Sequence, residues 1–570
     1  MSLFGALNLG KSSLATQQTA LEVTGNNIAN AGTSGYSRQV ANITTNPSVP
    51  TASGQYVGTG ATVASIQRQV SQALNDGLRH ATSDQYAADT LNTQLTQLQA
   101  VFGPLNDGDL ASQMTDFFNS FSTLANNPED SGQRAVVIQN GISLSQNLQS
   151  LRSQLGTMQS NIQSQITTQA STADSLAKQI AELNKQISAA GSPASAANAL
   201  MDQRDDALSQ LSQIMDIRVV DQGGGDLTVL VGSVPLVSGT TTRGVSTKLV
   251  SDSTGAVSLQ VVFGDNGDLM NPTGGQIGGL INARDNYINP AIQTVDSVAA
   301  GLINAVNTIH SQGQGLAGFS SVTGTTQVLN STVALNDPAA GIAFPPSNGS
   351  FNLYLTDAST GLITTQQINV NLSGQGTQDS LDSLVASINN AGGGAITASV
   401  NAAGNLVISS NDQNITFGFG EDTSGTLAAL GINTFFTGTN AGNIDVNQTL
   451  KDNSDLLATG RGNLAGSNQN AQALALAGAA SVSILGGKGI NDFYTSYIGA
   501  LASAGKTASD AATTRQTIHD TLFAQQQSIS GVSMDEEAIN LTQYQRAFQG
   551  SARFITVVDE MLQTILGLIS

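Results

Sequence analysis

Two glycine-rich segments have the spacing of nucleotide-binding loops. Gly5, Gly10, Lys11 and Ser12 fit GxxxxGKS, in which loop N–H groups between a buried strand and a helix surround a phosphate. Only four residues precede Gly5, which is too few for that strand, and the leucines around the motif have helical spacing. Residues 313–318 fit GxGxxG but follow a predicted helix, so we expect a flexible loop there. If the first match is accidental, Gly10 and Lys11 should tolerate alanine.

The other candidates for catalysis or metal binding lack partners in the sequence. His80, His310 and His519 are the only histidines, and none has a second histidine three or four residues away. The absence of cysteine removes thiolate catalysis, disulfides and cysteine-bound metals. The Asp-Gly turns at 107–109 and 265–268 lack the ligand spacing of a calcium loop. We therefore predict no catalytic residue, no cofactor and no metal.

Composition excludes several classes of partner. The chain has 570 residues, of which 39% are hydrophobic and only 11% are charged. Lys plus Arg number 20 and Asp plus Glu 40, so the net charge of −20 disfavours nucleic acid and anionic membrane surfaces. No apolar run is long enough for a transmembrane helix, and the first residues do not resemble a Sec signal peptide.

Both ends of the chain have the periodicity of amphipathic helices. Near the N-terminus, apolar residues recur every seven positions, at Leu7, Leu14, Leu21 and Ile28. Near the C-terminus, residues 533–536 form a predicted capping box, and a seam follows it. The seam consists of Leu541, Tyr544, Phe548, Ile555, Val558, Leu562 and Ile565, with Ser551 as its one polar interruption. These seams predict that the two helices pair with each other, and spacing alone leaves open whether they also meet other copies.

The segments between the ends divide by periodicity into helical and β-rich stretches. A long helix begins near Arg134, and one helix is expected near 378–391 inside the second β block. The predicted divisions are 1–64 (axial helix and loop), 65–215 (long helices), 216–275 (small β domain), 276–316 (helical return), 317–445 (inserted β-rich outer domain), 446–510 (linker and helical return) and 511–570 (C-terminal axial helix). The predicted fold class is therefore α + β multidomain: the terminal helices pair in a coiled-coil-like inner domain, beside a long helical bundle, with β-rich outer domains inserted.

Three stretches resemble one protein family. NNIANAGTSGYSRQ at 26–39 is similar to the N-terminal motif of flagellar rod, hook and junction proteins. Residues 200–220 and 278–318, with the Asn307, His310 and Gly313 pattern, resemble the central helices of the flagellar hook-associated protein 1 family. SGVSMDEEAINLTQYQRAFQGSARFITVVDEML, which starts at Ser530, is close to that family's C-terminal signature.

The resemblance implies a structural protein at the hook–filament junction and no enzyme. It implies type III export without a cleaved signal peptide and an extracellular location in the flagellum. The partners it implies are further copies of the chain in a ring, the hook protein, the second junction protein and an export chaperone on the C-terminal region. The expected assembly interface is the pair of terminal seams named above.

Three other functions stay open at this point. A secreted adhesin or binding protein fits the β-rich middle, although it does not explain the capped C-terminal helix. Another axial protein of the hook or rod fits the ends of the chain. A glycan-acting enzyme would need a pair of carboxylates in one cleft of the 317–445 block.

Overall fold

The protein divides into two compact units that are interleaved along the chain. The computed structural model describes residues 3–50, 54–103, 109–190, 197–223, 225–251, 257–462, 464 and 466–569. The first unit comprises Met1–Gln94, Asn161–Arg284 and Lys506–Ser570, and the second comprises Leu95–Ser160 and Asp285–Gly505. Both chain ends thus belong to one unit, as predicted from their matching periodicity.

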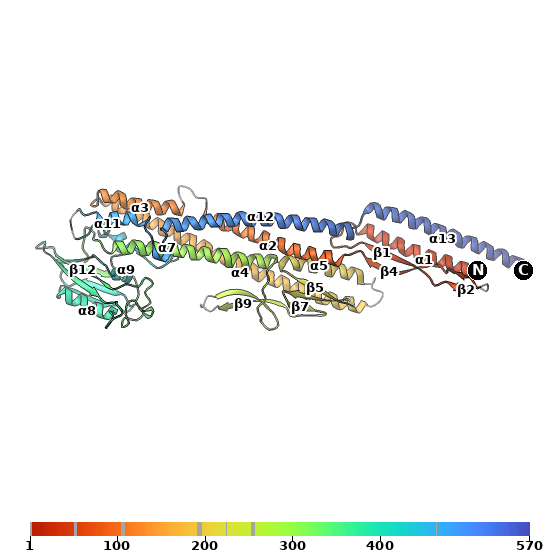
Figure 1. Cartoon of the computed structure of the whole chain (residues 1–570), viewed down its shortest axis with the longest axis horizontal. Helices are drawn as coiled ribbons and strands as arrows, with labels where there is room; N and C mark the ends of the chain where they lie inside the picture. The colour runs from red at the N-terminus through yellow and green to blue at the C-terminus, as the bar shows by residue number, and fades with distance from the viewer. Residues whose placement is uncertain are drawn as a thin grey trace. The chain divides into compact units, whose positions relative to one another are not determined.

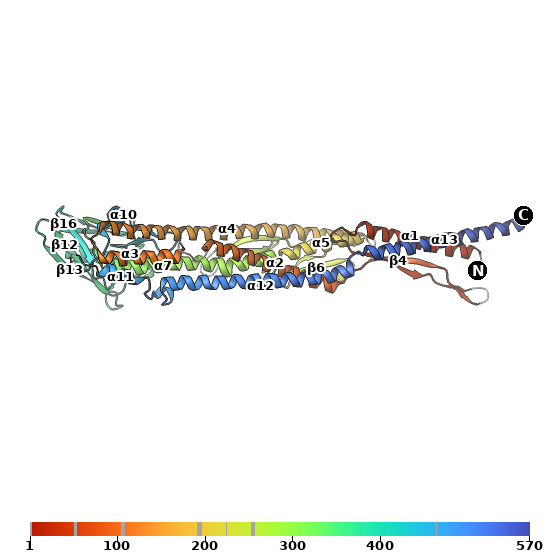
Figure 2. The same cartoon turned by 90° about the horizontal axis from the view of Figure 1, so that it is seen from above.

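Three long helices contribute residues to both units. They are α2 (Gln72–Phe102), α4 (Ser131–Ala190) and α12 (Ile490–Ser530). The predicted long helix is α4, which runs for 60 residues and appears as one uninterrupted helix in Figure 2. Its stripe of leucine and isoleucine at steps of three and four is buried, which explains why the sequence period identified it.

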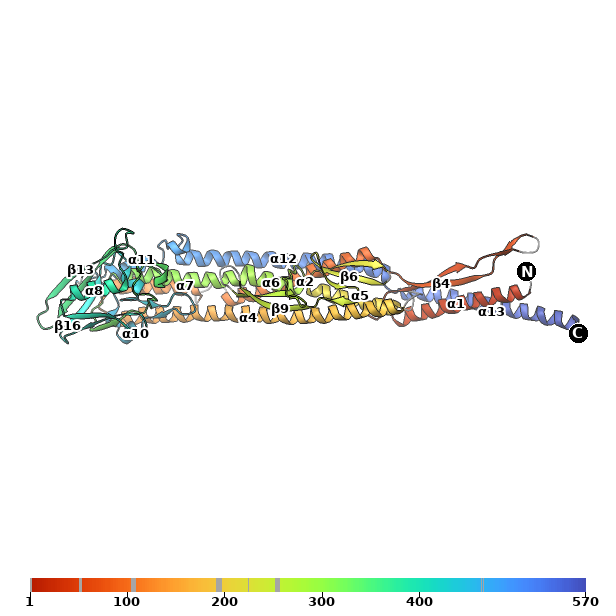
Figure 3. The same cartoon turned by 90° about the horizontal axis from the view of Figure 1, so that it is seen from below.

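The two terminal helices of the first unit lie side by side. The N-terminal helix is α1 (Leu3–Ala29) and the C-terminal helix is α13 (Met534–Ile569), as Figure 1 shows. A two-stranded ribbon of β1 (Gln39–Thr45) and β4 (Ala61–Arg68) follows α1 in the chain. Figure 3 shows this ribbon continuing into β2 (Val49–Pro50) and β3 (Tyr56–Val57).

The start of the long-helix segment differs from the prediction. Helical periodicity was expected from about residue 65, but residues 61–68 form β4, and α2 begins only at Gln72. The reason is long-range pairing, because each residue of β4 from Ala61 to Arg68 lies in the ladder with β1 or beside its one bulge. A ladder partner more than 15 residues away leaves no signature in the local period.

The remaining elements of the first unit are α5, α6 and two small sheets. They are α5 (Asn198–Ile214), the sheet of β5 (Arg218–Gly223), β6 (Asp226–Val231), β7 (Val234–Ser238) and β8 (Thr241–Thr242), the hairpin of β9 (Val245–Ser251) and β10 (Val257–Phe263), and α6 (Gly275–Ala283). Antiparallel neighbours follow one another in the chain throughout. The predicted shift to a period of two after residue 216 is therefore confirmed.

The second unit combines helices with a β-rich insert. The helices are α3 (Leu110–Asn126), a π-helical turn (Arg284–Ile288), α7 (Asn289–His310), α8 (Leu381–Gly392), α9 (Thr426–Leu430), α10 (Gln448–Asp452) and α11 (Gln469–Ala477), with 3₁₀ turns at Pro338–Ala340, Ser454–Leu456 and Ser483–Leu485. The strands are β11 (Ser321–Thr323), β12 (Gly349–Asp357), β13 (Ile363–Val370), β14 (Ile396–Val400), β15 (Leu406–Ser410), β16 (Ile415–Gly420), β17 (Phe436–Thr437) and β18 (Asp445–Val446).

The insert has its own hydrophobic core. Its sheets are ordered β13-β12-β16 and β11-β15-β14, and α8 lies at the predicted place in the chain. Phe351, Phe417 and Phe419 are fully buried between these elements, with Leu384 and Ile388 of α8 in the same cluster. The insert can therefore hold its shape with packing of its own.

Two polar side chains fasten the C-terminal end of α7 to the chain that returns from the insert. Asn307 Oδ1 accepts N–H bonds from Phe435 (3.0 Å) and Phe436 (2.8 Å). His310 Nε2 accepts from Ala458 N–H at 3.0 Å, so Nδ1 carries the proton and donates to the Asn433 carbonyl at 2.8 Å. Asn307 and His310, which belong to the resemblance noted above, are thus both buried and hydrogen-bonded to main chain.

No helix among the described residues combines the length and the apolar character needed to cross a membrane.

The neutral state of His310 predicts a pH dependence of stability. Burial lowers the pKa of His310 from 6.5 to about 4. Between those values the unfolded chain binds a proton that the folded chain does not, so stability falls as pH falls from 6.5 to 4. The loss reaches about 3 kcal/mol at the lower limit. In calorimetric melts, His310→Asn should show a weaker fall of Tm over this range than the unchanged chain.

The matched control for this measurement is Asn307→Ala, because Asn307 holds the same segment through the N–H groups of Phe435 and Phe436 but does not titrate. That control should lower Tm and keep the pH dependence of the unchanged chain. Parallel Tm curves for His310→Asn and the unchanged chain would contradict the assignment.

Candidate functional site at the paired terminal helices

The predicted seam of α13 faces α1 at Ile555 and Ser551, whereas its last member, Ile565, is 42% exposed. Ile555 packs where α1 has no side chain, since a Cβ built on Gly10 would lie 2.6 Å from Ile555 Cγ1. One α-helical turn away, Ser551 Oγ and Ser13 Oγ are 2.8 Å apart. Ser551 therefore does not interrupt the seam, because its hydroxyl has partners there: Ser13 Oγ and the Ala547 carbonyl, which it reaches at 2.9 Å. These contacts close the chain on itself, because Ser13 and Ser551 are 538 positions apart.

The most buried residues of α1 are mostly small or polar: Gly10, Thr16, Ala20, Val23, Thr24 and Asn27. They serve two neighbours, since Gly10 meets Ile555 of α13, whereas the Thr16 hydroxyl donates to the Ala61 carbonyl of β4 at 2.8 Å. The predicted stripe of Leu7, Leu14, Leu21 and Ile28 is half-buried. The pairing of the helices is confirmed, and the use of this stripe in assembly stays a prediction.

A second apolar stripe on α13 remains exposed. Val557, Met561, Ile565 and Leu566 have 42% to 66% of their surface exposed, although Val558 between them is fully buried. Phe4 of α1 is 71% exposed. The pair of helices thus buries one stripe of α13 and leaves the next one open to solvent.

At the start of α13, the Glu537 carboxylate lies in a buried cluster of polar side chains. Only 2% of the Glu537 side chain is exposed, and Arg38 Nε reaches Oε1 at 2.8 Å. Asn27 Nδ2 donates to Oε2 at 3.1 Å and to the Gln39 carbonyl at 2.8 Å. Asn27 Oδ1 accepts from Gln39 N–H (3.0 Å) and from the Tyr36 hydroxyl (2.8 Å). We call these five residues the Glu537 cluster.

The Glu537 cluster continues toward α5 through Ser37. Arg68 Nε forms an ion pair with Asp202 at 2.8 Å, and Arg68 Nη2 donates to Ser37 Oγ at 3.3 Å. Burial, together with the carboxylates of Asp202 and Glu537, raises the pKa of Tyr36 to about 12, so its hydroxyl stays a donor. The motif at 26–39 is therefore a set of contacts that joins α1, β1, α5 and α13.

The predicted capping box is half formed. Glu536 N–H reaches Ser533 Oγ at 3.4 Å, as a capping serine requires. The Glu536 carboxylate instead pairs with Arg38 Nη1 at 2.9 Å. The ion pair draws this carboxylate to the Glu537 cluster and away from the Ser533 N–H.

The glycine-rich segments are packing positions. Gly5 to Ser12 lie within α1, so no loop is present to hold a phosphate. Gly315 would place a Cβ 2.2 Å from the Asp455 carbonyl, and Gln314 N–H bonds to the Gly460 carbonyl at 2.9 Å. The segment at 313–318 is a loop, as expected, and main-chain hydrogen bonds from Gln314 and Leu316 fasten it to residues 455–460. Among the described residues, no three His, Cys, Asp or Glu side chains are placed to hold a metal.

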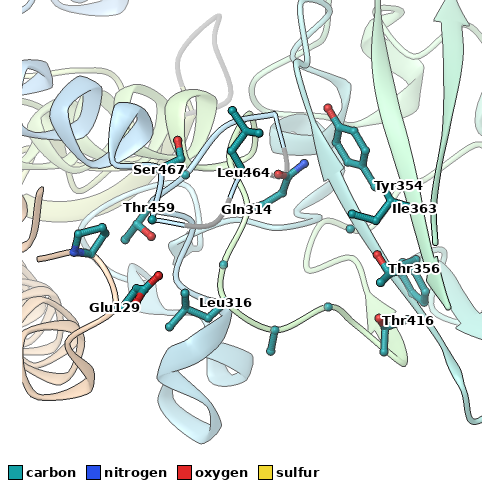
Figure 4. A pocket seen from close by; sticks show the side chains of 18 residues that line it. Glu129, Gln314, Leu316, Tyr354, Thr356, Ile363, Thr416, Thr459, Leu464 and Ser467 are labelled. Carbon is teal, nitrogen blue, oxygen red and sulfur yellow. The ribbon is translucent and has the colours of Figure 1, made fainter. Parts of the chain in front are cut away.

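A cleft of about 340 Å³ lies in the second unit beside that loop. Figure 4 shows Tyr354, Thr356 and Thr416 on the strands at one side and Glu129 at the other. Glu129 is the single carboxylate among the described lining residues, and it does not come from the 317–445 block. The cleft therefore lacks the paired carboxylates that a glycan-cleaving mechanism requires.

Comparison with known proteins places this arrangement in a class. Residues 95–325 match the helical domain of flagellar hook-associated protein FlgK. Residues 7–36 match flagella basal body rod proteins, and residues 525–568 match the C-terminal region of flagellar basal body rod FlgEFG proteins. The two rod-type matches cover the paired helices. The chain is thus an axial flagellar protein whose ends form the shared element of that class.

Full-length relatives define the family within that class. Flagellar hook-associated protein 1 of Escherichia coli (strain K12) is 28% identical, and those of Salmonella typhimurium and Bacillus subtilis (strain 168) are each 25% identical. The alignments cover 99% of this chain and 98–99% of each relative. The chain is thus similar along its whole length to proteins of the flagellar hook-associated protein 1 family, a family of structural flagellar proteins.

A solved structure agrees at the level of the fold. The flagellar hook junction protein FlgK from Burkholderia pseudomallei superimposes with a TM-score of 0.51 at 19% identity. The match covers 80% of this chain and all of that one.

The contact between Ser13 and Ser551 predicts a specific cross-link. Because the chain has no cysteine, Ser13→Cys with Ser551→Cys introduces the only two thiols. Two Oγ atoms 2.8 Å apart place the Cβ atoms within disulfide range. Mild oxidation should therefore convert most of the chain to an intramolecular disulfide, measured by mobility on non-reducing gels. Ser13→Cys with Gln549→Cys is the control, since Gln549 is exposed. Equal cross-linking of both pairs would contradict the register.

Close packing at Gly10 overturns the expectation that both residues 10 and 11 tolerate alanine. A Cβ at position 10 meets Ile555, whereas Lys11 is exposed. In the cross-linking background, Gly10→Leu should slow disulfide formation about tenfold by separating the helices, and Lys11→Leu should not. Equal rates for the two variants would show that α1 and α13 do not approach here.

Proposed function

We propose that the protein is the structural adapter that joins the hook to the filament of the bacterial flagellum, assembled as a ring through its terminal helices. The observation that carries the proposal is similarity to hook-associated protein 1 over 99% of the chain. The pairing of α1 with α13 supports it, because that element is the one shared with other axial proteins.

The proposed partners follow from the family. They are further copies of the chain, the hook protein, the second junction protein and, before export, a chaperone bound to the C-terminal region. The proposed location is the extracellular flagellum, reached by type III export. The absence of cysteine supports export as an unfolded chain, because no disulfide has to be broken or formed on the way.

The proposed assembly interface is the set of apolar residues on the two terminal helices. It comprises Leu7, Leu14, Leu21 and Ile28 of α1, and Leu541, Tyr544, Phe548, Ile555, Val558, Leu562 and Ile565 of α13. Pairing within the chain divides this set. Ile555 and Val558 are turned toward α1, while Ile565 and the half-buried leucines of α1 still have surface to offer another copy.

The exposed stripe of α13 supports contact between copies. Val557, Met561 and Leu566 would leave a large apolar area in water if the chain stayed single. Burying one such side chain contributes about 1.5–3 kcal/mol, so a few on each copy can offset part of the entropy lost on assembly.

Aspartate substitutions separate packing within the chain from packing between chains. Val557→Asp should prevent assembly and leave the Ser13–Ser551 cross-link intact, because Val557 faces outward. Ile555→Asp should abolish both, because Ile555 contacts Gly10. Each variant is expressed in a strain that lacks the gene, and filaments are counted by electron microscopy. Normal filaments with Val557→Asp would exclude this stripe as an interface.

Deletion of the gene tests the junction role itself. We expect bare hooks in electron micrographs and unpolymerised flagellin in the culture medium, because filament subunits would have no surface to grow on. Normal filaments on the deletion strain would contradict the proposal.

A further inference from the structure

The turn between α12 and α13 spans only residues 531–533 and is fastened by the segment that follows α1. Arg38 N–H donates to the carbonyl of Ser530, the last residue of α12, at 2.9 Å. Gly531 N–H closes α12 on the Gln527 carbonyl at 2.9 Å. Four residues after the turn, Glu537 enters the Glu537 cluster. Residue 38 therefore holds both sides of one turn, with its main chain on α12 and its side chain on α13.

The seam between α1 and α13 cannot fix the direction of α13 by itself. The contact of α1 with α13 is made at small residues such as Gly10 and Ser13, and Val558 is the one α13 seam residue that is fully buried. Apolar contacts of this kind favour burial but discriminate weakly between neighbouring registers and angles. The first turn of α13 needs a contact with defined geometry.

The Glu537 cluster has that geometry because the Asn27 amide is saturated and each Glu537 oxygen has a partner. Asn27 donates twice and accepts twice, which uses every bond its amide can form. Both oxygens of Glu537 are bonded, one to Arg38 and one to Asn27. A shift of α13 by one residue would leave a buried carboxylate and a saturated amide without their partners, and such groups are costly when unpaired.

We propose that Asn27, Arg38 and Glu537 are positioning residues that set the direction in which α13 leaves α12. They thereby hold the terminal pair of helices at a fixed angle to α5 and the sheets of the first unit. This role is a property of the free chain, so it stands or falls independently of the assembly proposed above.

Spin labels measure this angle directly in the full-length chain. Gln210→Cys on α5 and Gln549→Cys on α13 are both exposed, and they are the only thiols. The distance between the two labels should have one narrow distribution in the otherwise unchanged chain. Glu537→Gln should broaden that distribution, because an amide presents a donor to Arg38 or to Asn27. The protection of α13 amides from hydrogen exchange should fall about 10- to 100-fold, without loss in β6 or α5.

One further variant separates positioning from a general effect of charge or stability. Asp535→Asn removes the same charge from an exposed position in the same helical turn and should leave the narrow distribution unchanged. An unchanged distribution in Glu537→Gln, equal broadening in Asp535→Asn, or loss of protection throughout the first unit would each overturn the proposal.

Discussion

The first unit depends on a closure of the chain, in which residues near its two ends touch. Ser13 meets Ser551, and Ile555 fills the space above Gly10. Every stretch of the second unit is therefore an excursion of the chain that starts from the first unit and comes back to it. The interleaved stretches of the two units are the consequence, since the first unit takes three stretches of chain and the second takes the two between them. Modules can be inserted in such a chain without changing how its ends meet.

A buried ion pair contributes little to stability, but it can fix the orientation of the elements that it joins. The free-energy cost of removing the Glu537 carboxylate from water offsets most of the stabilisation from its ion pair with Arg38. Its value lies in direction, because a planar guanidinium and a saturated amide accept a carboxylate in few orientations. The protein has few charges to use, at 11% of its residues, and places several of them around this one turn.

Hydrophobic periodicity predicted the long helices, but it predicted only some of the contacts between them. The α13 seam and the long α4 follow from local spacing, because one face of a helix packs on one neighbour. The close contact of α1 with α13 at Gly10 and Ser13 was not predicted, because counting apolar residues finds leucines and passes over glycine and serine. Gly10 fits a nucleotide-loop pattern, and only the position of Ile555 reveals its packing role.

The Glu537 cluster could not be predicted from the sequence, for a different reason. Its members come from residues 27, 36–39 and 537, and no period joins positions 510 apart. The motif at 26–39 was visible only as a resemblance, without a physical role. The same is true of Asn307 and His310, whose partners at 433–436 and 458 are far away in the chain.

Both units use buried polar side chains, hydrogen-bonded to main chain, to hold segments in place. Arg134 is wholly buried and donates to the carbonyls of Pro128 and Leu457 and to the Thr459 hydroxyl, while Asp422 accepts N–H bonds from Ser424 and Leu427. In each case a buried polar side chain bonds to main chain, and burial alone would penalise it. An apolar contact lowers the free energy of many arrangements, but such a bond lowers that of one. The chain has no tryptophan, no cysteine and 60 glycines. Buried polar side chains are therefore a main means by which its turns and loops are held in one conformation. This is the property a structural member of a polymer needs, because small errors in each subunit accumulate along the assembly.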